Sequence, residues 1–135
     1  MSLSGLVDLF CTEPTLSATL ANARESRPAA LDLTAPPPMR PLIAAAMATS
    51  AERGGAGRPV LVVTSTYREA EELTAALECL LPREDVVYYP AWETLPHERL
   101  SPRSDTVGRR LAVLRRLAHP AAADAEHGPV QVVVA

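Results

Sequence analysis

The amino-acid sequence predicts an α/β domain with a largely parallel sheet flanked by helices. Residues 60–63 read VLVV, a continuous apolar run that is typical of a strand covered by helices on both faces. Residues 69–81 then place leucines and glutamates on opposite sides at helical spacing, and a second apolar run follows at residues 85–89. Because strands alternate with helices, we expect right-handed crossovers onto a parallel sheet.

The N-terminal part of the chain predicts two helices and a strand. Apolar residues recur at helical spacing over residues 3–10 and again after Pro14. Apolar residues alternate around Asp32, which predicts a short edge strand over residues 31–33.

A proline-rich loop and a third helix come next. Residues 35–41 contain four prolines, which disfavour a helix until Pro41 opens one. That helix is expected over residues 41–52, with Gly54 and Gly55 as its stop signal.

The remaining elements follow from capping and periodicity. Thr66 and Glu69 predict a capping box, in which each side chain accepts from the other's backbone amide. After the strand at 85–89 comes a proline-rich loop at residues 90–104. A further helix over residues 105–118 is expected to bury one apolar stripe, formed by Val107, Leu111, Leu114 and Ala118.

The chain ends on a β-prone run at residues 130–135. From this we expect a fragment of a longer chain, truncated at its C-terminus within the sheet. An open sheet edge at residues 130–134 would pair with a second molecule and produce a dimer.

Composition excludes several function classes. The 135 residues make one domain, and all 13 basic residues are arginine, so no Schiff-base lysine or P-loop lysine is present. A net charge of −3 argues against a stand-alone nucleic-acid module. Cys11 and Cys79 are far apart and form no zinc motif. No apolar run is long enough to span a membrane, and we expect a cytoplasmic protein.

No catalytic, cofactor-binding or metal-binding residue is predicted. In α/β sheets, phosphates bind on glycine amides between a strand and the next helix, which here is the loop at residues 35–41. That loop has no glycine and no lysine. His97 lies in the loop at 90–104 without the spacing of a metal motif, so we interpret it as an exposed loop residue.

The loop at residues 90–104 contains the only tryptophan, Trp92. A lone tryptophan anchors a loop onto its own domain or serves as an interface anchor. On the helix that follows, Arg109 and Arg116 lie opposite the expected buried stripe. They form either a solvated face or a contact for nucleic acid or an acidic protein. Arg110 is expected to tie the Trp92 loop down through a carboxylate such as Glu93.

The run WETLP at residues 92–96, followed by SP and an arginine-leucine pair, resembles the N-terminal domain of bacterial transcription-repair coupling factors. The strand at 60–63, with its following TST, resembles a segment of a superfamily 2 helicase lobe. The resemblance covers residues 29–135, whereas residues 1–28 form an N-terminal helical segment that resembles the family only loosely. The candidate structural or interaction motif comprises Trp92, Glu93, Leu95, Pro96, Ser101, Pro102 and Arg110.

The resemblance implies a degenerate RecA-like lobe, homologous to the first domain of UvrB, that has lost its nucleotide-binding motifs. It implies a non-catalytic scaffold within an ATP-dependent DNA translocase that displaces stalled RNA polymerase and recruits UvrA for transcription-coupled nucleotide excision repair. ATP, magnesium, polymerase and DNA would bind distant domains of that protein, and UvrA mainly the neighbouring domain. Two alternatives stay open: a nucleotide-dependent lobe with arginine in an unconventional phosphate site, and a DNA-binding module on the arginine-rich helix.

Overall fold

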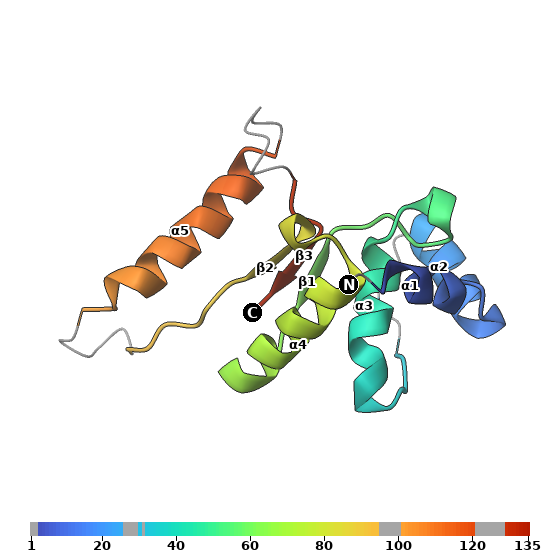
Figure 1. Cartoon of the computed structure of the whole chain (residues 1–135), viewed down its shortest axis with the longest axis horizontal. Helices are drawn as coiled ribbons and strands as arrows, with labels where there is room; N and C mark the ends of the chain where they lie inside the picture. The colour runs from blue at the N-terminus through green and yellow to red at the C-terminus, as the bar shows by residue number, and fades with distance from the viewer. Residues whose placement is uncertain (1–2, 26–29, 31, 95–100, 121–128) are drawn as a thin grey trace.

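A computed structural model describes residues 3–25, 30, 32–94, 101–120 and 129–135. Within these ranges, helices and strands alternate along the second half of the chain (Figure 1). The helices are α1 (Ser4–Cys11), α2 (Pro14–Glu25), α3 (Arg40–Ala48), α4 (Tyr67–Leu80) and α5 (Ser104–Ala118). The strands are β1 (Val60–Val62), β2 (Val86–Tyr88) and β3 (Val132–Val134).

The three strands form a parallel sheet in the order β1-β3-β2. Val132 pairs in register with Val60 on one side and with Val86 on the other. The predicted α/β class with a parallel sheet is therefore confirmed. The expectation of an open edge at residues 130–134 is wrong, because β3 lies between the other two strands and is paired along both sides.

One face of the sheet carries the core. The side chains of Val132 and Val134 are fully buried there against α3 and α4, together with Leu77 of α4. Val7 of α1 and Leu20 of α2 are also fully buried in the same apolar cluster. The two N-terminal helices thus pack on the same core as the sheet. The predicted boundary between residues 28 and 29 lies outside the described residues.

The glycine turn before β1 is tied to α2 by two arginines. Arg24 donates to the carbonyls of Gly54 and Gly55, while Arg58 donates to the carbonyls of Ala23 and Arg24. Gly54 has a φ of 88°, a conformation that favours glycine. Gly54 and Gly55 were expected to stop the third helix, but Gly54 instead ends a short 3-10 turn over Ala51–Arg53. The bonds from Arg24 join this turn to a helix that lies 30 to 31 positions earlier in the sequence.

The third helix differs from its predicted range. It begins at Arg40, after a short 3-10 turn over Pro37–Met39, and ends at Ala48 instead of residue 52. Thr49 leaves the helix with extended backbone, and its hydroxyl donates to the carbonyl of Ala45. The predicted strand at 31–33 is also not formed where it can be assessed, since Asp32 and Leu33 are not in a strand and Leu31 lies outside the described residues.

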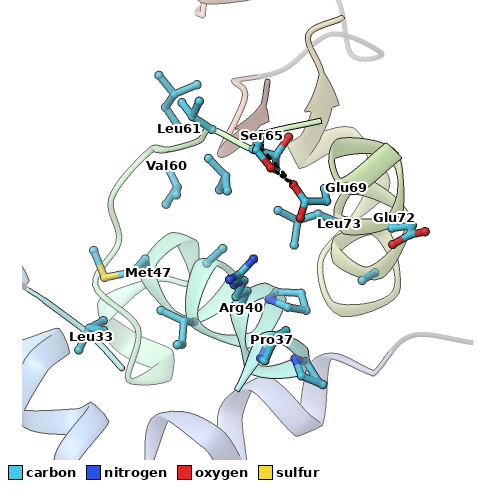
Figure 2. Close-up of a pocket in the computed structure, with 18 residues that line it drawn as sticks. Leu33, Pro37, Arg40, Met47, Val60, Leu61, Ser65, Glu69, Glu72 and Leu73 are labelled. Atoms are coloured by element: carbon cyan, nitrogen blue, oxygen red, sulfur yellow. Dashed lines mark hydrogen bonds between the residues drawn. The ribbon is translucent and has the colours of Figure 1, made fainter. Parts of the chain in front are cut away.

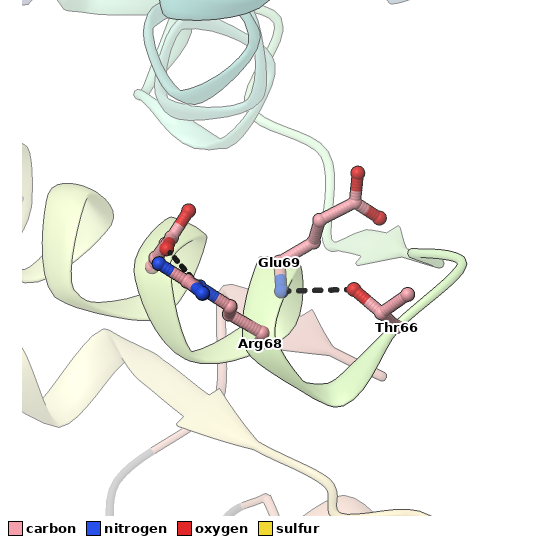
Figure 3. A network of polar contacts seen from close by, with 4 residues as sticks. Thr66, Arg68 and Glu69 are labelled. Atoms are coloured by element: carbon pink, nitrogen blue, oxygen red, sulfur yellow. Dashed lines mark hydrogen bonds and ion pairs between the residues drawn. The ribbon is translucent and has the colours of Figure 1, made fainter.

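The predicted capping box is half confirmed. The Thr66 hydroxyl accepts from the backbone amide of Glu69 at 3.2 Å, as Figure 3 shows. The Glu69 carboxylate does not return to the amide of Thr66. It accepts from the amide of Ser65 at 3.2 Å and from the Ser65 hydroxyl at 2.6 Å. The start of α4 is therefore bonded to two residues of the loop after β1, Ser65 and Thr66, whereas the capping box involves Thr66 alone.

The predicted buried stripe of the last helix is wrong. Leu111 and Leu114 are 60% and 47% exposed, whereas Thr106 and Val113 are buried. Thr106, Arg110 and Val113 recur at helical spacing and define the inward side of α5. Polar contacts of Arg110 with the preceding loop, described below, set this rotation of the helix.

Candidate functional site

The loop at residues 35–41, which was expected to follow a strand and to be the place where a phosphate could bind, follows no described strand and has its amides occupied. Pro37, Pro38 and Pro41 have no backbone N–H. Between them, the amide of Met39 donates to the carbonyl of Pro36 at 2.9 Å, and the amide of Arg40 donates to the carbonyl of Pro37. No amide over residues 37–41 is thus left to bind an anion. This arrangement is the opposite of a glycine-rich phosphate cradle.

A groove of about 940 Å³ opens between α3, β1 and the start of α4 (Figure 2). Its walls are mainly apolar, with Met47, Val60 and Leu73 among them. Arg40, Glu69 and Glu72 are its charged members. Hydrogen bonds from Ser65 hold the pKa of the Glu69 carboxyl below its ordinary value, and the charge of Arg40 lowers this pKa further. The sequence patterns did not predict this groove, because its wall residues come from three separate segments.

Arg110 of α5 contacts the first residues of the Trp92 loop and the tyrosine that precedes it. The guanidinium carbon of Arg110 lies 4.0 Å from the ring centroid of Tyr89 and 4.3 Å from that of Trp92. The same guanidinium donates a hydrogen bond to the carbonyl of Pro90. A cation stacked between two aromatic rings is a favourable arrangement. We call these four residues the Arg110 clamp.

Glu93 caps α5 from the loop that precedes the helix. Its carboxylate accepts from the backbone amide of Arg103 at 3.1 Å and from the hydroxyl of Thr106. The bond from Thr106 and that from the Arg103 amide hold the pKa of Glu93 below its ordinary value. Arg110 was predicted to hold the loop through Glu93. It holds the loop through the carbonyl of Pro90 and two rings instead, while Glu93 bonds the start of α5.

The other residues of the predicted motif lie around this clamp or outside it. Ser101 is exposed and Pro102 is half-buried, just before α5. Leu95 and Pro96 lie outside the described residues. The WETLP run is thus placed only at its first three positions, and those include both Trp92 and Glu93.

Arg109 and Arg116, predicted as a polar surface, both have partners within the chain. Arg109 pairs with Asp105 at 3.0 Å, one helical turn away. Arg116 donates to the backbone carbonyl of Glu84, across from the start of β2. A role for either residue in binding nucleic acid or protein stays a prediction.

Within the described ranges, no three metal-ligating side chains converge on a common point. No helix in the same ranges is long and apolar enough to cross a membrane.

The fold and these contacts define an α/β lobe with a proline-rich turn before α3 and with its helix α5 held to the aromatic residues Tyr89 and Trp92 through Arg110. The chain is 48% identical over 132 residues to the transcription-repair-coupling factors of Mycobacterium bovis and Mycobacterium tuberculosis. The match covers 98% of this chain and 10% of each relative. The transcription-repair-coupling factor of Rickettsia bellii is 32% identical over 57 residues, which are 42% of this chain and 5% of that protein. No protein-family model matches the chain.

These similarities confirm the resemblance that the WETLP run and its neighbours indicated. The chain is homologous to a segment of the transcription-repair-coupling factors, Mfd. It spans about a tenth of the length of the curated relatives that it matches most extensively.

Proposed function

We propose that this chain is a non-catalytic scaffold and interaction domain of a transcription-repair-coupling factor. Such a protein, by the family resemblance, displaces stalled RNA polymerase and recruits UvrA for nucleotide excision repair. The printed name of the relatives supports a role in coupling transcription to repair. Because the chain spans a tenth of their length, ATP hydrolysis and DNA translocation are assigned to other parts of the protein.

The observation that carries this proposal is the state of the amides at the start of α3. Three of the five residues at 37–41 are proline, and the other two amides are already bonded within the loop. Nucleotide phosphates need several free amides and a cation at this position. Arg40 supplies a cation there without the amides, which supports a lobe that kept its fold and lost its nucleotide site.

Calorimetry with ATP and magnesium tests the non-catalytic role. We expect no saturable heat when ATP with magnesium is titrated into the chain. The alternative, a nucleotide-dependent lobe that uses arginine, requires saturable binding that disappears in an Arg40→Ala variant. Arg68→Ala is the matched control. Arg68 is an exposed arginine on α4, and it forms an ion pair with Glu72, one helical turn further along the same helix. Saturable binding that Arg40→Ala abolishes and Arg68→Ala leaves intact would refute the proposal.

Deletion of the domain tests the interaction role. In a full-length coupling factor without this domain, we expect ATP hydrolysis to persist and co-purification with UvrA to decrease. A deletion that leaves both UvrA binding and strand-specific repair unchanged would contradict the scaffold role. A deletion that abolishes ATP hydrolysis would contradict the assignment of catalysis to other domains.

A further inference from the structure

We draw no further inference here: the strongest candidate, the mainly apolar groove between α3, β1 and the start of α4, is an unpartnered face, and nothing in the part of the chain that the structure describes shows what covers it.

Discussion

Removal of the Arg110 guanidinium is expected to release the Trp92 loop from α5. The perturbation is Arg110→Ala, which removes contacts to the rings of Tyr89 and Trp92 and one hydrogen bond to the carbonyl of Pro90. Two cation–π contacts at a partly exposed site contribute about 0.5–1 kcal/mol each. The hydrogen bond adds about 0.5–1.5 kcal/mol. Because Trp92 is 49% exposed, we take the lower part of this range, about 1.5 kcal/mol.

A loss of about 1.5 kcal/mol raises the population of the open loop about tenfold. Hydrogen exchange of the α5 amides is the assay, because the clamp acts on local opening more than on the core. The emission of Trp92 gives a second readout, since it is the only tryptophan in the chain. We expect about tenfold faster exchange at the start of α5 and a red shift of the emission.

Arg109→Ala is the control for this prediction. Arg109 neighbours Arg110 on the same helix, but its contact is an exposed pair with Asp105 one turn away. Such pairs contribute about 0.3–0.5 kcal/mol. If the two variants accelerated exchange equally, or if Arg110→Ala left the Trp92 emission unchanged, the clamp would not hold the loop and the reasoning would be refuted.

Three more outcomes are expected. Leu77→Ala, at a fully buried site, lowers the free energy of unfolding by about 3 kcal/mol, measured by urea denaturation; a loss below about 1 kcal/mol would show that Leu77 is not in the core. Gly55→Ala places a Cβ 2.1 Å from the carbonyl oxygen of Thr49 and destabilises by about 2–3 kcal/mol, whereas Gly108→Ala on α5 meets nothing within 4 Å and stabilises by about 0.5–1 kcal/mol. Because the pKa of Glu93 is lowered from 4.5, its support of α5 is present above that pH and is lost as the pH falls through the lowered pKa. The opening of α5, measured by hydrogen exchange, should increase as the pH falls through the lowered pKa in the wild type. In Glu93→Gln it should show no such dependence on pH.

Local signals in the sequence predicted most elements of the fold. The strand at 60–63 and the amphipathic helix after it are formed nearly as expected, because burial on one side imposes a periodic pattern that is visible in the residues. The N-cap at Thr66 is also a local signal, since donor and acceptor are three residues apart. The prolines at 35–41 predicted a loop with few free backbone amides, and the amide of Met39 in that loop is bonded to the carbonyl of Pro36.

Long-range contacts decided what local patterns left open. Periodicity placed Val107, Leu111 and Leu114 on the buried side of α5, but a polar residue, Arg110, faces inward because two rings and a carbonyl from another segment receive it. No spacing rule predicts such a contact, since its partners lie 18 to 21 positions away in sequence.

The sequence by itself determined the class of fold, the positions of the main helices and strands, and the absence of a lysine for phosphate. These properties depend on residue types and on neighbours within one helical turn. Only the tertiary structure decided that β3 is central, that α5 turns its leucines outward, and that Glu93 caps a helix ten residues further on. Each of these depends on which distant segments meet in space, because strand order and the rotation of a helix are set by packing and by bonds between separate elements.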